Sequence, residues 1–278
     1  MKQKTKRRSS RTSRISRARR ADKYDLYQKS VQEPDADLHL ISRVFRTHYG
    51  QWPRLLREDF CGTAMMACRW VERHAENRAW GIDLDPQPLE WGRKHNQARL
   101  REDQAARVKL IEGDVRSIGH QRVDITVAFN FSYFIFETRP ELRHYFEKAR
   151  ATLKSQGLLI LDAYGGGDAQ RTGEEKRSLP GFKYIWDQHV FDPISHAGTN
   201  YIHFEFPDGS RLRRAFAYDW RLWTLPEIRE LLIEAGFSKI EIYWEGTDSE
   251  TGEGNSIFTR RERALDDPAW VAYIAAVP

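Results

Sequence analysis

The sequence predicts an α/β fold in which a mostly parallel sheet carries helices on both faces, and three observations support that class. Predicted strands and helices alternate five times between residues 53 and 164, as they do in sheets built from β–α units. Two strands contain the apolar runs "ITVAF" and "LLIL", which are typical of strands buried on both sides. The length of 278 residues is enough for one large α/β domain.

Each element of the predicted sheet has its own signal. The expected strands are residues 53–59, 78–85, 107–114, 123–130 and 157–164, with helices over roughly 64–75 and near 86–100. Another helix begins after Thr138, which forms a capping box with Glu141. Residues 23–48 predict helices that are separated at Pro34.

The pattern changes after the fifth strand. The glycines and polar residues of 165–180 predict a mobile loop. Antiparallel strands are expected at 183–191, 200–206 and 211–220. A helix begins at the capping box of Thr224 and stops at Gly236. Two more strands, 239–246 and 270–277, are separated by a long polar loop that includes residues 247–256.

The net charge of +5 hides a strongly basic end. Residues 1–20 carry ten lysines and arginines and no acid, so the rest of the chain has a net charge of −5. This composition cannot bury a core, and residues 1–22 are therefore expected to be a disordered tail. Three interpretations stay open: the tail binds RNA through its phosphates, it is a solvated tail without a partner, or it results from a mispredicted start codon.

Several classes of protein are disfavoured by composition. No apolar run approaches the length of a membrane helix, and the basic end is not followed by the apolar region of a secretory signal. The only two cysteines, Cys61 and Cys68, lack a second cluster at metal-ligand spacing. We therefore expect a soluble, cytoplasmic protein with reduced thiols and no metal.

Polar residues follow successive strands of the predicted sheet, where open parallel sheets bind their ligands. The first strand ends in Glu58 and Asp59, followed by the turn 60–63; the next three strands end in Asp83, Asp114 and Asn130. Asp83 lies 21 residues after Gly62, a spacing at which a carboxylate reaches a pair of ribose hydroxyls. Asp114 is placed to accept a hydrogen bond from an exocyclic amine such as that of adenine.

This set resembles the class I S-adenosylmethionine-dependent methyltransferases, which have a Rossmann-like, doubly wound sheet. "REDFCGTA" looks like their first motif, E/D-x-G-x-G-x-G, "GIDLDP" like their second, "EGDV" like their third, and "FNFSYF" takes the place of their fourth. The resemblance covers roughly residues 50–245, and the final strand pair matches the antiparallel hairpin that ends their sheet. It implies S-adenosyl-L-methionine as cofactor, bound by Tyr27, Glu58, Phe60, Cys61, Gly62, Thr63, Asp83, Leu84, Asp114, Val115 and Asn130.

The first motif departs from the family pattern. Phe60 and Ala64 stand at two of the three glycine positions, and Arg57 and Asp59 are unusual charges for a first strand. A dinucleotide pyrophosphate needs bare backbone N–H groups at a helix N-terminus, whereas a sulfonium tolerates nearby acids. A turn with few glycines and many acids therefore favours S-adenosylmethionine over NAD.

The resemblance also suggests how the rest of the domain, residues 23–278, is organised. Residues 23–50 would fold over the cofactor as a helical lid, and Tyr27 would contact the sulfonium through its ring face. Residues 182–223 contain 11 aromatic residues and would form an antiparallel insertion that covers the substrate. Such an insertion favours a small-molecule acceptor.

The acceptor and a catalytic base are not identified by the sequence. Tyr133, His189 and His203 are the candidates for a general base, and each has an alternative role in packing or at the surface. Two alternative functions remain: an NAD-dependent oxidoreductase, disfavoured by the missing G-x-G-x-x-G, and a non-catalytic relative that binds RNA through residues 1–20. The oligomeric state is not predicted.

Overall fold

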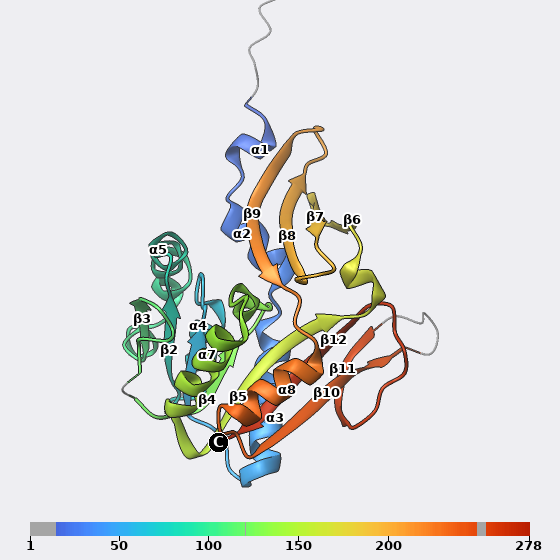
Figure 1. Cartoon of the computed structure of the whole chain (residues 1–278). Coiled ribbons are helices and arrows are strands. Elements are labelled where there is room, and N and C mark those ends of the chain that lie inside the picture. The colour runs from blue at the N-terminus through green and yellow to red at the C-terminus, as the bar shows by residue number, and fades with distance from the viewer. Residues whose placement is uncertain (1–14, 120, 249–253) are drawn as a thin grey trace, which may run out of the picture.

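The computed structural model describes residues 15–119, 121–248 and 254–278, and its centre is a sheet of eight strands (Figure 1). The strand order is β11-β10-β12-β5-β4-β1-β2-β3. The strands are β1 (Leu55–Asp59), β2 (Arg78–Asp83), β3 (Val108–Glu112), β4 (Val123–Ala128), β5 (Leu153–Gly165), β10 (Lys239–Thr247), β11 (Gly254–Arg261) and β12 (Trp270–Val277). The strands β3, β2, β1, β4 and β5 are parallel, and β12, β10 and β11 continue the sheet in antiparallel pairs. The expected mostly parallel sheet with an antiparallel end is confirmed.

Helices cover both faces of this sheet. On one face, α7 (Arg139–Ala151) and α8 (Leu225–Glu234) bury their apolar sides; on the other, α3 (Pro34–Tyr49), α4 (Met65–Arg73) and α5 (Pro86–His95) do so. The shorter helical elements are α1 (Arg17–Arg20), α2 (Lys23–Val31), η1 (Gln97–Arg99), α6 (Glu102–Ala105), η2 (Ser132–Ile135) and η3 (Gly167–Gln170). The capping boxes predicted at Thr138 and Thr224 both form.

The order of the strands determines where a ligand binds. The chain runs outward from β1 through β2 to β3 and then returns to β4 on the other side of β1. Between β1 and β4 the connections therefore leave in opposite directions, which opens a crevice beyond the carboxyl ends of these strands. The sequence segments 59–64 and 129–131 meet at this point.

A second sheet of four antiparallel strands lies above that edge of the main sheet (Figure 1). Its order is β6 (Gly173–Leu179), β7 (Phe182–Phe191), β8 (Ala197–Glu205) and β9 (Arg211–Arg221). Helix α2 packs on this sheet, because Leu26 belongs to the same apolar cluster as Phe182 and Phe204. Helix α2 thus belongs to the second sheet, whereas α3 packs on the main sheet.

Two expected loops are partly wrong. The second half of the loop 165–180 is the edge strand β6, whose polar side chains give no alternating signal but whose backbone pairs with β7 over seven positions. The polar segment after β10 contains β11, which pairs with β10 and adds a strand that the sequence did not predict. Residues 249–253 lie outside the described residues.

The predicted tail differs from the structure at its C-terminal end. Residues 1–14 lie outside the described part of the chain. Residues 17–20 form α1, where the Arg17 N–H donates to Asp208 Oδ2 at 2.9 Å and the Ala18 N–H donates to Ser210 Oγ at 3.1 Å. The turn between β8 and β9 therefore supplies acceptors that order residues expected to be disordered.

Candidate active site

The turn between β1 and α4 keeps the backbone path of a glycine-rich loop although it has one glycine. Phe60, Gly62 and Ala64 have φ values of 57°, 51° and 53°, all in the left-handed region that residues with a Cβ atom rarely adopt. These are the three positions at which the first motif of the methyltransferases has glycine. Two side chains are thus accommodated at the cost of local strain.

Neighbouring groups hold this turn in place. Its closest approach is to α5, where a Cβ atom on Gly92 would lie 2.4 Å from the Thr63 carbonyl oxygen. Thr63 Oγ1 accepts a hydrogen bond from Gln28 Nε2 of α2 at 2.7 Å. The Cys61 side chain is buried against Gly81 and offers a ligand only its backbone.

Glu58 points from the end of β1 toward the start of α4. It is 7% exposed, and its Oε2 accepts the Ala67 N–H at 2.8 Å. No cation pairs with this carboxylate among the described residues. Burial, with smaller contributions from Asp83 and Asp37, raises the pKa of Glu58 to about 8.

Asp83 organises the neighbouring strand end. Its Oδ2 accepts the Gly62 N–H at 2.7 Å and its Oδ1 accepts the Asp85 N–H at 2.9 Å, which joins the ends of β1 and β2. Burial raises its pKa. The next residue, Leu84, is an apolar side chain that is 70% exposed, so it offers an uncovered apolar surface beside the carboxylate.

The unusual charges of β1 have a structural role. Arg57 Nε donates to Asp59 Oδ1 at 2.6 Å, and the same guanidinium donates to the carbonyl oxygens of Val115, at 2.7 Å, and Ile118. Tyr145 completes the pair by donating to Asp59 Oδ2 at 3.1 Å. This buried ion pair fixes the loop that follows β3.

That loop carries Asp114 and Val115. Asp114 Oδ2 accepts a hydrogen bond from Arg116 Nη2 at 2.6 Å, and the hydrogen bonds from Arg116 lower the pKa of the carboxyl group. Val115 is buried, and no described residue accepts its backbone N–H. In this arrangement the Asp114 carboxylate already has a cationic partner.

The other side of the crevice is formed by Asn130 and Phe131. Both have left-handed backbones, with φ values of 56° and 57°. Their N–H groups donate to the two carboxylate oxygens of Asp162 on β5, at 2.6 and 2.9 Å. Burial of the carboxyl group, opposed by these hydrogen bonds, raises the pKa of Asp162 to about 7.

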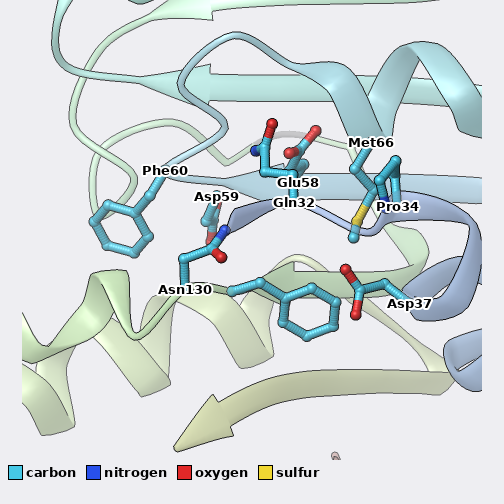
Figure 2. A pocket seen from close by; sticks show the side chains of 9 residues that line it. Gln32, Pro34, Asp37, Glu58, Asp59, Phe60, Met66 and Asn130 are labelled. Carbon is cyan, nitrogen blue, oxygen red and sulfur yellow. The ribbon is translucent and has the colours of Figure 1, made fainter. Parts of the chain in front are cut away.

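A small pocket lies between these strand ends, with an interior volume of about 20 Å³, which is roughly the room that one water molecule needs (Figure 2). Its lining comes from the chain before and within α3, from β1 and the turn after it, from α4 and from the end of β4: Gln32, Pro34, Asp37, Glu58, Asp59, Phe60, Met66, Phe129 and Asn130. The buried Gln32 Oε1 has no hydrogen-bond partner. Tyr273 donates to Asp37, and burial raises the pKa of Asp37 to about 6. The acidic oxygens of the pocket thus outnumber its donors.

Helix α2 packs on the second sheet and also contacts the turn after β1. The Tyr27 ring packs 4.9 Å from that of Phe216, and burial raises the pKa of the Tyr27 hydroxyl well above its usual value. At the start of the helix, Trp91 Nε1 of α5 donates to Asp22 Oδ2 at 2.6 Å. Contacts with α5, with Thr63 and with β9 therefore hold α2 across the crevice.

The three candidates for a general base lie away from the pocket. Tyr133 is completely buried, and its hydroxyl donates to the Asp162 carbonyl oxygen at 2.8 Å. His189 is exposed on β7. His203 of β8 lies 3.1 Å from Asp187 Oδ2 through Nε2. The structure brings none of them to the pocket lining, and the sequence could not exclude them because it does not give the direction of a side chain.

Glu174, Asp187 and His203 converge on the second sheet in an arrangement that could suggest a metal. However, the Arg214 N–H donates to His203 Nδ1 at 2.7 Å. The neutral ring therefore carries its proton on Nε2, the nitrogen that faces the carboxylates. The lone pair that a metal would need is not available there.

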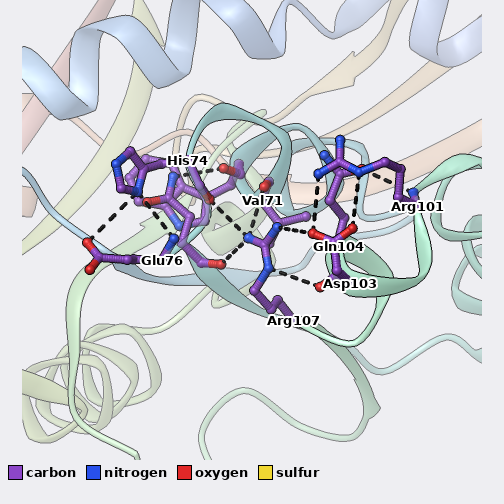
Figure 3. Close-up of polar contacts among 9 residues, drawn as sticks. Val71, His74, Glu76, Arg101, Asp103, Gln104 and Arg107 are labelled. Atoms are coloured by element: carbon purple, nitrogen blue, oxygen red, sulfur yellow. Dashed lines mark hydrogen bonds and ion pairs between the residues drawn. The ribbon is translucent and has the colours of Figure 1, made fainter.

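A further polar network lies outside the pocket and is structural (Figure 3). Arg107 Nη1 donates to the carbonyl oxygens of Val71, His74 and Asn77 at 3.0, 3.0 and 2.7 Å, and its Nε donates to the Asp103 carbonyl at 3.0 Å. These carbonyls follow or end α4 and α6, where backbone acceptors lack partners within the helix. Arg107 thus fastens the helix ends to the start of β3.

Comparison with known families and structures agrees with this geometry. A family model described as a methyltransferase domain matches residues 60–157, the segment from the strained turn through the start of the apolar run of β5. A comparison with curated proteins gives no match.

Solved methyltransferases share the architecture over nearly the whole chain. DesVI of Streptomyces venezuelae is 19% identical, with a TM-score of 0.64, and the alignment covers 93% of this chain and 98% of that one. CalS10 of Micromonospora echinaspora, an amino pentose methyltransferase bound to S-adenosylmethionine, is 16% identical with the same coverage and TM-score. An S-adenosylmethionine-dependent methyltransferase of Clostridium acetobutylicum is 14% identical, with coverage of 90% and 96% and a TM-score of 0.62.

These similarities establish the class of fold. The chain has the Rossmann-like fold of class I methyltransferases, and residues 60–157 carry the sequence pattern of a methyltransferase domain.

The strained turn leads to a first prediction. The left-handed conformation of Ala64 costs roughly 1–2 kcal/mol, and glycine at this position would remove that cost. Glycine also makes the unfolded chain more flexible, which lowers stability by roughly 0.5–1 kcal/mol. We expect Ala64→Gly to raise the free energy of unfolding by up to about 1 kcal/mol in urea titrations. The control, Ala67→Gly within α4, should lower it by about 1 kcal/mol. Equal destabilisation by both variants would show that residue 64 is not strained.

Proposed function

We propose that this protein is an S-adenosylmethionine-dependent methyltransferase that acts on a small-molecule acceptor. The observation that carries the proposal is the acid-lined pocket at the ends of β1 and β4, within a chain that has the methyltransferase fold and domain pattern. S-adenosylmethionine combines a sulfonium and an ammonium group. Such a ligand supplies the positive charge and the N–H donors that the pocket lacks.

The polar groups that line the pocket suit the methionine end of this cofactor, and the lining side chains would move apart to admit it. Gln32 Oε1 is buried without a partner, and Asp37 and Glu58 have no cationic partner among the described residues. An ammonium group would donate to these oxygens, and charge-assisted hydrogen bonds of this kind are the stronger ones. Phe60 and Asn130 line the same pocket and would limit the position of the methionine chain.

The neighbouring strand ends suit the adenosine. Asp83 is held by the Gly62 and Asp85 N–H groups and would accept from the two ribose hydroxyls. The exposed side chain of Leu84 would cover one face of the adenine, and the Val115 N–H would donate to a ring nitrogen. Asp114 would accept from the exocyclic amine through a lone pair that Arg116 leaves free.

Methyl transfer needs alignment and the exclusion of water rather than elaborate acid–base chemistry. When bound, the cofactor supplies an activated methyl group. The side chains from β1, β4 and α3 would orient it. Residues 23–50, whose helix α2 is tied to Thr63 by Gln28, would act as a lid over the cofactor and exclude water. Tyr27 would contribute its ring to this lid. No base is assigned, because Tyr133, His189 and His203 lie elsewhere.

The proposed acceptor rests on the second sheet and on the substrates of similar methyltransferases. Residues 182–223 would cover the acceptor as a substrate-binding insertion within a domain that spans 23–278. Three similar structures are those of an amino pentose methyltransferase, a sugar N-methyltransferase and a glycopeptide N-methyltransferase. These similarities favour a small-molecule acceptor with a nucleophilic nitrogen.

The other functions have less support. An NAD-dependent oxidoreductase would place a pyrophosphate against Glu58 and Asp83, which repel it. RNA binding would depend on residues 1–20, of which 1–14 lie outside the described residues. Among the residues that the structure describes, no helix combines the length and the apolar character needed to cross a membrane. We propose a cytoplasmic location on the basis of the sequence.

Thermal-shift measurements with several ligands test the cofactor. We expect S-adenosylmethionine and S-adenosylhomocysteine to raise the melting temperature and NAD to leave it unchanged, because a ligand that binds only the native state stabilises it. The Asp83→Asn side chain keeps one oxygen that can accept the Gly62 N–H, but it can no longer accept hydrogen bonds from both ribose hydroxyls. It should therefore weaken cofactor binding roughly 10- to 100-fold. Asp219→Asn, at an exposed position of β9, is the control. A shift with NAD alone would refute the assignment.

Glu58 gives a prediction on pH and stability. Its pKa of about 8 in the folded protein lies above its value in the unfolded chain, so its stabilising contribution is full at low pH and is lost as pH rises toward 8. Glu58→Gln should therefore gain stability over the wild type between pH 5 and 8. The gain should reach roughly 4 kcal/mol near pH 8 and stay constant at higher pH.

The same variant should bind S-adenosylmethionine more weakly, because it lacks the charge. Glu112→Gln, at the exposed end of β3, is the matched control and should show no pH-dependent gain in urea titrations. A constant difference between Glu58→Gln and the wild type across this pH range would contradict the buried, uncharged state of Glu58.

A further inference from the structure

A second and larger groove lies between α8 and the outer strands of the main sheet. It has a volume of about 340 Å³ and is lined by Leu225, Pro226, Arg229, Glu230, Ile233, Ile242, Trp244, Arg261, Glu262, Arg263 and Ala264. None of these residues lines the pocket of Figure 2. The groove is therefore a separate site, and it does not depend on the proposed cofactor.

The floor of the groove is apolar. Alternation along β10 turns Ile242 and Trp244 toward α8, while Glu241 and Tyr243 face the opposite side and are buried there. Helix α8 leaves both floor residues half-exposed. The Trp244 ring packs against Trp270 at 5.1 Å between centroids, so it presents a flat and well-supported surface.

Three arginines surround this floor: Arg229 from α8, Arg261 from the end of β11 and Arg263 from the segment that follows. All three are exposed, and none forms an ion pair with another described residue. The neighbouring Arg260 lies 3.2 Å from Glu241, on the other face of the sheet. The groove thus collects guanidinium groups whose charge is not neutralised within the described chain.

The two acids at the rim do not cancel this charge. Glu230 lies 3.9 Å from Arg139, and Glu262 lies 3.5 Å from Arg260. Both partner arginines are outside the groove lining. Each of these arginines also pairs more closely with another acid, Arg139 with Glu234 at 2.6 Å and Arg260 with Glu241 at 3.2 Å. The groove remains positive because its lining carries three arginines and two acids.

We propose that this groove binds a small organic anion that carries a flat apolar ring. Guanidinium groups bind carboxylates, sulfonates and phosphates in paired hydrogen bonds, and the Trp244 face would pack against the ring. The volume lies in the range of small-molecule sites, which combine an apolar lining with a few polar groups. An extended acidic peptide is a different class of ligand, and the test separates the two.

The probe is anilinonaphthalenesulfonate, titrated into the full-length protein and followed by its fluorescence. We expect saturable binding of one probe per chain, weakened about tenfold by Arg229→Gln and by Arg263→Gln, and by more in the double variant. Trp244→Leu should also weaken it. Arg213→Gln is the matched control, because this exposed arginine of β9 also lacks an ion-pair partner among the described residues. Thermal melts would verify that each variant is folded.

Three results would overturn the proposal. The first is probe binding that is absent or not saturable. The second is displacement of the probe by S-adenosylhomocysteine, which would place the probe in the pocket between β1 and β4. The third is a hexaglutamate peptide that competes with the probe while benzoate and phenyl phosphate do not, which would assign the groove to an acidic polypeptide. Failure of the proposed methyltransferase function would leave all these outcomes unchanged.

Discussion

Carboxylates without a cationic partner are the constraint on which the site depends. Asp37 and Glu58 line one small pocket, and burial raises their pKa values to about 6 and about 8. An isolated charge is costly to bury. In the ligand-free protein at neutral pH, Glu58 is therefore mostly protonated and uncharged. A cationic ligand would favour the ionised form of these carboxyl groups instead. The same lining that disfavours a pyrophosphate therefore favours a sulfonium and an ammonium group.

The backbone around this pocket is held by side chains from distant parts of the sequence. Phe60 and Ala64 adopt left-handed conformations because Asp83, Gln28 and α5 fix the turn between them. The buried pair of Arg57 and Asp59 holds the loop after β3 in a similar way. Strained backbone of this kind persists where the surroundings determine it and is common at functional sites.

Periodicity and capping predicted most of the main sheet, because buried parallel strands and capped helices have strong local signals. The edge strands β6 and β11 were missed, since their stability comes from backbone pairing rather than from apolar alternation. Asp37 was missed because only the tertiary fold brings α3 to the end of β1. Conversely, the charges of Arg57 and Asp59 are unusual for a first strand, and their partners lie far away in the sequence. Arg57 donates to the Val115 carbonyl oxygen, 58 residues away, and Asp59 accepts from the Tyr145 hydroxyl, 86 residues away.

The most direct test of the account is the number of protons released when S-adenosylmethionine binds. A cation lowers the pKa of nearby carboxyl groups, so binding at pH 7 should release protons, chiefly from Glu58, and the release should vanish near pH 9, where that group is already ionised. Calorimetric titrations in buffers of different ionisation enthalpy give this number. Release at pH 7 that disappears in Glu58→Gln is the predicted result. Proton uptake, or no exchange between pH 6 and 8, would contradict the acid-lined cofactor pocket.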